Sequence, residues 1–225
     1  MCGRFTQERP TSELAEIFDA EELAPNEGGH FNVAPTDEAA VVVQREERRA
    51  ITRYRWGLVP HWAEEPRIAG RTFNARLETV DSLPAFRAAF RRRRCVVPVD
   101  SFYEWRREND VRQPYRIAAA DGSPLALAGL WAGWREPETE AIRRTFTIVT
   151  TRAAGPITEL HDRMPVMLGA ESWRAWIDPR GRDPGELRAI LEASEPPALE
   201  IYPVVRLVNN VRNDGPELAE RLVPA

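Results

Sequence analysis

Cys2 stands at a position where a cysteine can acquire a second reactive group. Initiator methionines are commonly removed when the next residue is small, and loss of Met1 would leave Cys2 with a free α-amine beside its thiol. The ordinary pKa values of these two groups are about 8 and about 8.5, so both are partly deprotonated near neutral pH. Such a 1,2-aminothiol can condense with an aldehyde to a Schiff base, onto which the thiol closes as a thiazolidine. The alternative is a buried, unreactive cysteine near the start of a strand, because free cysteines are often buried.

Arginine alone carries the positive charge of the chain. All 31 basic residues are arginines, and no lysine is present. A GC-rich coding bias explains this composition without any function. Its chemical consequence is that a Schiff base with an aldehyde can form only at the α-amine. The net charge of -4 argues against a protein that coats nucleic acid indiscriminately, but it leaves room for a local basic groove.

Two further residues could transfer protons. Glu104 stands among aromatic residues in the segment SFYEW, where burial would favour its neutral form and raise its pKa towards general acid–base use. The other interpretation is an exposed glutamate at a strand edge. His161 lies in the polar turn HDRMP, and an imidazole can exchange protons near neutral pH. The sequence alone does not say whether these residues meet.

The chain has no pattern typical of a metal or cofactor site. Its three histidines are far apart, and no Cys-x-x-Cys, His-x-Glu or His-x-x-x-His spacing occurs. Glycine-rich phosphate loops and a Gly-x-Ser-x-Gly motif are missing as well. We therefore expect neither a metal nor a cofactor.

The elements that must position these residues are short helices and strands. Helical spacing of apolar residues predicts helices over 11–23, 82–92, 170–177 and 183–193, and a helical turn over 156–160. Alternation and apolar runs predict strands over 40–44, 51–58, 95–99, 114–119, 124–134, 144–151 and 199–206. Asp121-Gly122 is a hairpin signal, so strands 114–119 and 124–134 are expected to pair.

Three further features also call for an interpretation. Trp62, in a Pro/Gly loop, is expected to anchor the core rather than to stack on bases. The run 91–94 of four arginines ends a predicted helix and suits its dipole as a solvated face, although it could also face DNA phosphates. Cys95 begins a buried-strand pattern and is expected to be inert.

The length of 225 residues allows one large domain or two small ones. Because the chain has no internal repeat and no linker that would divide it, the expected helices and strands predict one α+β domain over residues 1–225, dominated by antiparallel sheet. No apolar run reaches the ~18 residues of a membrane span, and no secretory signal pattern begins the chain. Two cysteines do not make a disulfide framework. We therefore expect a cytoplasmic protein in a reducing environment.

A set of short motifs follows in order along nearly the whole chain. They are MCGRF, FNVAP, WGLVPHW, FNARLET, RRCVVP, FYEW, TIVTT and HDRMPV, followed by YPV and NDGPEL near the end. This set resembles the SRAP (SOS-response-associated peptidase) family of abasic-site processing proteins. The resemblance implies strongly twisted, mostly antiparallel, barrel-like sheets with peripheral helices.

The resemblance also implies an activity. After loss of Met1, Cys2 would form a covalent thiazolidine crosslink with the ring-opened sugar of an abasic site in single-stranded DNA. An abasic-site lyase activity and autoproteolytic removal of Met1 are further activities that it suggests. The expected partner is single-stranded DNA containing abasic sites, bound by a monomer without metal, cofactor or membrane and associated with the nucleoid when on DNA.

Residue roles follow from the resemblance by motif. Cys2 would be the nucleophile, and Asn74 of FNAR would hold the N-terminus and the linkage. Glu104 would shuttle protons, and His161 would act on the sugar O4'. The phosphate contacts would be Arg4, Arg76 and Arg163, and the groove would be lined by Asn32, Pro35, Trp62, Trp105 and Thr150.

The chain departs from the family pattern at two places. Ala63 stands where some relatives have a second Trp, and Leu83-Pro84 stands where some have a basic residue, so one stacking wedge and one phosphate contact are in doubt. Three alternatives stay open: a cysteine-type peptidase using Cys2, a non-catalytic single-stranded DNA-binding module, and a Cys2 that merely packs.

Overall fold

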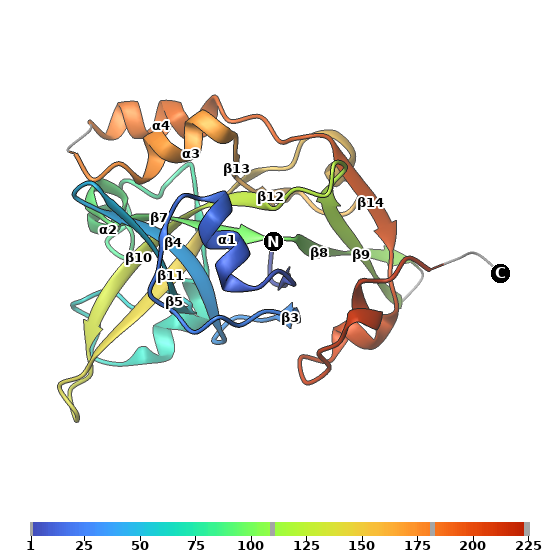
Figure 1. Ribbon diagram of the computed structural model, residues 1–225, viewed down its shortest axis with the longest axis horizontal. Helices are drawn as coiled ribbons and strands as arrows, with labels where there is room; N and C mark the ends of the chain where they lie inside the picture. Colours follow the sequence, from blue (N-terminus) through green and yellow to red (C-terminus); the bar gives the residue numbers. More distant parts are fainter. Residues whose placement is uncertain (1, 109–110, 181–182, 223–225) are drawn as a thin grey trace.

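The computed structural model describes residues 2–108, 111–180 and 183–222. Within these ranges the chain forms two β-sheets, four short α-helices and several 3-10 turns (Figure 1). The α+β, mostly antiparallel architecture is the one expected from the sequence. No helix in the described ranges is long and apolar enough to cross a membrane.

Five strands of the larger sheet close into a barrel. They are β4 (Glu38–Arg45), β5 (Arg48–Trp56), β7 (Arg94–Val99), β10 (Leu125–Arg135) and β11 (Ile142–Arg152). Their order is β11-β10-β7-β4-β5, and β5 then pairs with β11. A ring of five strands cannot be antiparallel at every junction, and the β5–β11 junction, at Arg55–Thr145 and Trp56–Phe146, is the parallel one. The barrel-like sheet implied by the family resemblance is thus confirmed.

The edge of β11 that closes the barrel also carries the strand with Asn74. After β5 the chain turns away at Gly57, whose φ of +114° suits only glycine. It returns through η1 (Pro66–Arg71) as β6 (Asn74–Arg76), which runs parallel to β11 with Asn74 opposite Ile148. The backbone of Asn74 is therefore fixed at the rim of the barrel.

Three short strands extend the larger sheet. β12 (Arg163–Pro165) pairs with β11, β13 (Met167–Leu168) with β10, and β2 (Glu21–Glu22) with β5. His161 stands just before β12, between that strand and η2 (Gly155–Glu159). The pairing of β12 with β11 brings this turn to the same rim as β6.

The second sheet is antiparallel throughout, in the order β14-β9-β8-β1-β3. Its strands are β1 (Phe5–Gln7), β3 (His30–Val33), β8 (Ser101–Glu108), β9 (Val111–Ala119) and β14 (Leu199–Pro203). Only Asp100 separates β7 from β8, so the chain passes there from the barrel into the second sheet. Phe5 and Phe102 share a buried cluster with the barrel residue Trp56. The two sheets therefore have a common core.

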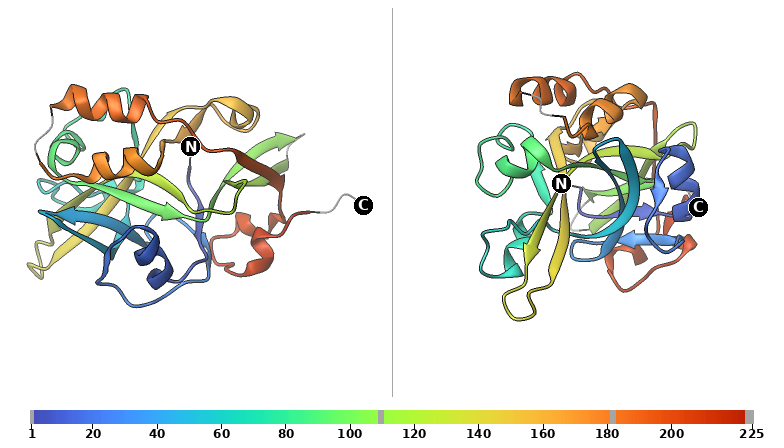
Figure 2. Two further views of the ribbon diagram at one scale, coloured as in Figure 1. Left: turned by 45° about the horizontal axis from the view of Figure 1, so that its top comes forward. Right: turned by 60° about the vertical axis from the view of Figure 1, so that its left-hand side comes forward.

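The helices cover the outside of the barrel, and Figure 2 shows α3 and α4 lying along it. They are α1 (Thr11–Ile17), α2 (Arg87–Arg92), α3 (Ala170–Ile177) and α4 (Pro184–Glu192). Trp173 and Trp176 of α3 pack in one cluster with outward-facing barrel residues such as Val42 and Val96. The C-terminal turns η3 (Arg206–Asn209) and η4 (Pro216–Ala219) pack on the second sheet through Val208 and Leu218.

Several expected elements change at their ends. The helix expected over 11–23 ends at Ile17, after which Asp19 takes a φ of 48° and β2 begins. The helix expected over 82–92 begins only at Arg87, because Pro84 and a series of turns precede it. The expected hairpin at Asp121-Gly122 is wrong. The turn exists, with Gly122 at a φ of +73°, but β9 and β10 belong to different sheets.

Candidate active site

Cys2 is fully buried just before β1, and its backbone is held from the barrel. The side-chain amide of Asn74 donates a hydrogen bond to the carbonyl oxygen of Cys2, with Nδ2 and O 2.7 Å apart. The other side-chain atom of Asn74, Oδ1, is buried without a hydrogen-bond partner in the described part of the chain. Asn74 thus fixes one backbone group of Cys2 and keeps an acceptor available beside it.

Glu104 lies on β8, next to Cys2, and is only 2% exposed. Burial raises the pKa of Glu104, and the nearby His161 is among the groups that oppose this rise. Burial also raises the pKa of the Cys2 thiol, and the negative charge of Glu104 adds to that rise. These effects link Glu104 with Cys2 on one side and with His161 on the other. The interpretation of Glu104 as a desolvated acid is confirmed, and the exposed strand-edge interpretation is wrong.

His161 is partly buried and faces the same cavity as Glu104. Its Nδ1 accepts a hydrogen bond from the backbone N–H of Arg163 at 2.9 Å and lies 2.7 Å from an oxygen of Asp162. The cavity measures about 290 Å³, and Glu104, Trp105, Arg107, Arg112 and His161 line it. An acid, an imidazole, an indole and two guanidinium groups therefore surround one small space.

The indole of Trp105 is held in place by its neighbours. Its Nε1 donates a hydrogen bond to Oδ1 of Asn209 at 2.6 Å, and the guanidinium of Arg4 lies 5.7 Å from the ring centre. Arg4 in turn donates to Oδ1 of Asn32 at 2.7 Å and to the carbonyl of Val208 at 2.8 Å. Burial lowers the pKa of Arg4. The side chains of Asn32 and Arg4 therefore contact other parts of the protein and hold the Trp105 ring in position.

Arg163 and Thr150 are buried as well. The guanidinium of Arg163 binds both carboxylate oxygens of Glu78, at 2.5 and 2.9 Å, and the carbonyl oxygen of Thr150 at 2.7 Å. This hydrogen bonding lowers the pKa of Glu78. The positive charge of Arg163 is thus already balanced by a carboxylate.

The remaining expected DNA contacts lie nearer the surface. Arg76 is exposed at the end of β6, two residues after Asn74, and Pro35 is partly buried after β3. Trp62 is 50% exposed, so its expected role as a core anchor is wrong. An exposed indole is free to stack on a base, which is the role that the family resemblance gives it.

Residues 1–211 match the family described as SOS response associated peptidase (SRAP). The chain belongs to the SRAP family. A Bacillus subtilis protein named abasic site processing protein YoqW is 36% identical over 223 residues, covering 98% of this chain and 99% of that protein. An Escherichia coli protein named abasic site processing protein YedK is 31% identical over 230 residues, with the same coverage.

The SRAP chain also resembles a solved structure of low sequence identity. A crystal structure of a protein from Bacteroides thetaiotaomicron superimposes with a TM-score of 0.87, covering 99% of this chain and all of that one, at 22% identity. The likeness extends to the whole architecture, so the two-sheet arrangement is shared with that protein.

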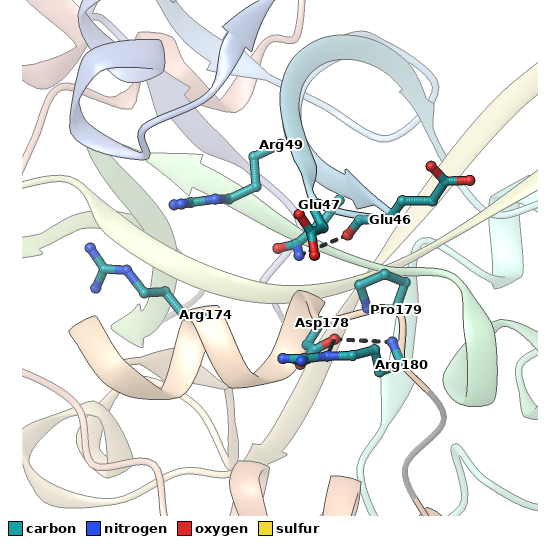
Figure 3. Close-up of a pocket in the computed structure, with 8 residues that line it drawn as sticks. Glu46, Glu47, Arg49, Arg174, Asp178, Pro179 and Arg180 are labelled. Atoms are coloured by element: carbon teal, nitrogen blue, oxygen red, sulfur yellow. Dashed lines mark hydrogen bonds and ion pairs between the residues drawn. The ribbon is translucent and has the colours of Figure 1, made fainter.

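A second hollow of this SRAP protein lies away from Cys2. It measures about 430 Å³ and lies between the β4–β5 turn and the end of α3 (Figure 3). Several of its charges are already paired: Arg180 with Asp178 at 2.7 Å and Arg49 with Asp19 at 2.6 Å. None of the candidate residues lines it. In the described ranges no group of three or more His, Cys, Asp or Glu side chains could hold a metal ion.

Sequence reasoning missed two residues of the site cavity, Arg107 and Arg112. Both lie outside the family motifs, in charged stretches that read as ordinary surface. Arg107 could have been found from the sequence, because alternate residues of a strand lie on one face and Arg107 is two residues after Trp105.

Proposed function

We propose that this chain processes abasic sites in single-stranded DNA, forming a thiazolidine crosslink through Cys2 once Met1 has been removed. Relatives at 36% and 31% identity are named abasic site processing proteins. The observation that carries the proposal is the 2.7 Å hydrogen bond from Asn74 to the carbonyl of Cys2, beside the buried Glu104. It fixes the backbone of the residue whose amine and thiol would react.

The first chemical step joins the α-amine of Cys2 to the aldehyde carbon of the ring-opened sugar. The neutral amine adds to the carbonyl to give a carbinolamine, which loses one water as the Schiff base forms. The departing hydroxyl needs a proton, and Glu104 is suited to supply it because burial raises its pKa. The unpartnered Oδ1 of Asn74 is an acceptor for an amine N–H and would orient the nitrogen lone pair.

The second step closes the ring. The thiol sulfur of Cys2 bonds to the same carbon, and the thiol proton leaves. Because burial raises the pKa of this thiol, a proton acceptor must stand nearby, and Glu104, now deprotonated, is that acceptor. The net change is one aldehyde consumed, one water released and Glu104 returned to its starting state. His161, in the same cavity, would protonate the sugar O4' as the ring opens, and the proton released by the C1' hydroxyl as it becomes the aldehyde would restore the imidazolium.

Recognition of the strand needs no base sequence. Trp62 and Trp105 can stack on unpaired bases, for about 1–3 kcal/mol each. An abasic nucleotide is already unpaired, so little energy is needed to expose it. Arg76 is exposed two residues after Asn74, which supports a contact between its guanidinium and a phosphate.

The test is covalent capture of an oligonucleotide. Wild-type protein with confirmed loss of Met1 should give a complex with abasic single-stranded DNA that survives a denaturing gel. Cys2→Ala, or an added N-terminal residue that blocks the amine, should give none. Stable capture by Cys2→Ala would overturn the proposal. Equal noncovalent binding of intact and abasic strands without capture would favour a simple binding module, and cleavage of generic peptides would favour a peptidase.

A further inference from the structure

Arg107 and Arg112 line the site cavity although no assigned role involves them. They share its wall with Glu104, Trp105 and His161. Arg107 is on β8 and Arg112 on β9, and both side chains are exposed. Their charges therefore lie at the open side of the cavity that contains the proposed proton-transfer residues.

The register of the two strands sets these arginines directly opposite one another. Residues opposite each other in an antiparallel pair have Cβ atoms about 4.5–5.5 Å apart on the same face, and like charges in such a pair are destabilising. An anion between two such guanidinium groups would remove the repulsion and accept hydrogen bonds from both.

Neighbouring arginine side chains are paired with a carboxylate or an aromatic ring, but the guanidinium groups of Arg107 and Arg112 have no such partner in the described part of the chain. Arg116 pairs with Glu8, and Arg163 pairs with Glu78. Arg106 lies over the ring of Tyr115. No described carboxylate contacts Arg107 or Arg112, and the pKa of Glu104 on the same cavity is raised, which reduces its ability to balance them. Their positive charge is open to an external anion.

We propose that Arg107 and Arg112 together clamp one phosphate of the DNA strand next to the abasic nucleotide. This inference rests on the proposed function, since it places a phosphate beside the cavity in which the sugar would react. Guanidinium forks match phosphate oxygens, and one phosphate can bridge two forks. The clamp would fix the DNA strand relative to the indole of Trp105, which Asn209 and Arg4 hold in place.

The chain contains a matched control. Arg45 and Arg48 are also directly opposite one another, across the β4–β5 turn, and are also exposed. The guanidinium of Arg45 lies 5.6 Å from the ring centre of Trp131, away from the site cavity. Replacing this pair removes the same charge from the same kind of register position.

The experiment measures noncovalent binding of abasic single-stranded DNA at several salt concentrations, in a Cys2→Ala background. Each phosphate neutralised on a single strand contributes about 0.7 to the slope of log K against log salt. Arg107→Gln with Arg112→Gln should make this negative slope shallower by about 0.7, because the two arginines share one phosphate. Arg45→Gln with Arg48→Gln should leave it unchanged. An unchanged slope in the first variant, or an equal fall in the control, overturns the clamp.

A second arm identifies the phosphate. Strands with one uncharged methylphosphonate, moved along the positions around the abasic site, should bind wild-type protein weakly at one position only. The Arg107→Gln, Arg112→Gln variant should not respond to that position. Sensitivity lost at two positions would contradict a shared phosphate, and sensitivity lost at none would mean that the pair binds only free anions.

The two proposals can fail separately. Covalent capture by wild-type protein with an unchanged slope would remove the clamp and leave the crosslinking function. A shallower slope in the double variant, without covalent capture by wild-type protein, would support the clamp and overturn the crosslinking function.

Discussion

At the scale of single residues, burial determines how Cys2 can react. A thiol whose pKa is raised by burial supplies little thiolate at neutral pH, so it is a poor first nucleophile. The α-amine is the better group to begin, and the thiol follows when a base is at hand. Burial raises the pKa of Glu104 as well, so the same environment would suit both groups to the proton transfers of the proposed reaction.

The buried carboxyl group of Glu104 should reduce stability at neutral and alkaline pH. Its pKa in the folded protein lies above its ordinary value of 4.5, so the folded chain keeps a proton that the unfolded chain releases. The free energy of unfolding therefore falls as pH rises from 4.5 through the raised value. Glu104→Gln should unfold at a higher temperature than wild type at pH 8, and the difference should vanish below pH 4.5.

Thermal unfolding at a series of pH values checks this prediction, with Glu138→Gln in an exposed loop as the control. The same variant should lose covalent capture of abasic DNA. A Glu104→Gln protein that is less stable than wild type at pH 8 would contradict the burial argument.

At the scale of elements, Arg94 joins two helices to the barrel. It begins β7, and its guanidinium donates hydrogen bonds to carbonyl oxygens at the end of α2, including Arg91 at 2.7 Å, and at the end of α3, including Trp176 at 2.6 Å. Helix ends leave carbonyl groups without internal partners, and a buried cation suits them. One side chain therefore satisfies two helix ends.

Arg94→Lys should destabilise the fold, because one ammonium cannot reach carbonyl groups on two helices. The loss should be about 2–4 kcal/mol, measured by urea unfolding. Arg92→Lys, an exposed neighbour in the same run, should change stability by less than about 0.5 kcal/mol. Equal effects of the two substitutions would contradict the capping role.

The difference between Arg94 and Arg92 depends on long-range packing, which the sequence alone does not predict. Periodicity predicts α3 over 170–177 and the strand over 95–99 correctly, because each pattern is local, whereas the strand that contains Glu104 is not predicted. The four arginines 91–94 look alike in the sequence, and only the packing of α3 against β7 singles out Arg94. The hairpin prediction at 121–122 is wrong for the same reason, because a turn does not specify which strands pair.

At the scale of the whole molecule, the candidate site lies where the two sheets meet. Glu104 lies in the second sheet and Cys2 just before its strand β1, whereas Asn74 lies on β6 and His161 just before β12, both of which pair with the barrel strand β11. The motifs identify these residues, but their meeting depends on closure of the barrel by β5 and β11. That closure is a long-range pairing, which no local pattern predicts.

Close packing inside the barrel should be required for this arrangement. A Cβ added at Gly129 would lie 2.8 Å from Sγ of Cys95 and 3.0 Å from Val97. Gly129→Ala should therefore cost about 1–3 kcal/mol of stability. Cys95→Ala in the same chain should recover part of this loss by removing the sulfur atom. A double-mutant cycle by urea unfolding measures the coupling, and strictly additive effects would contradict the proposed contact.

The central claim is that the amine and thiol of Cys2 react as one unit, and Cys2→Ser tests it most directly. The variant keeps the α-amine after loss of Met1, which an intact mass verifies, but it lacks sulfur. We predict that Cys2→Ser yields a complex with abasic single-stranded DNA only when borohydride reduces the Schiff base, whereas wild type yields one without reductant. A Cys2→Ser complex that survives a denaturing gel without reductant, in wild-type yield, would contradict the thiazolidine.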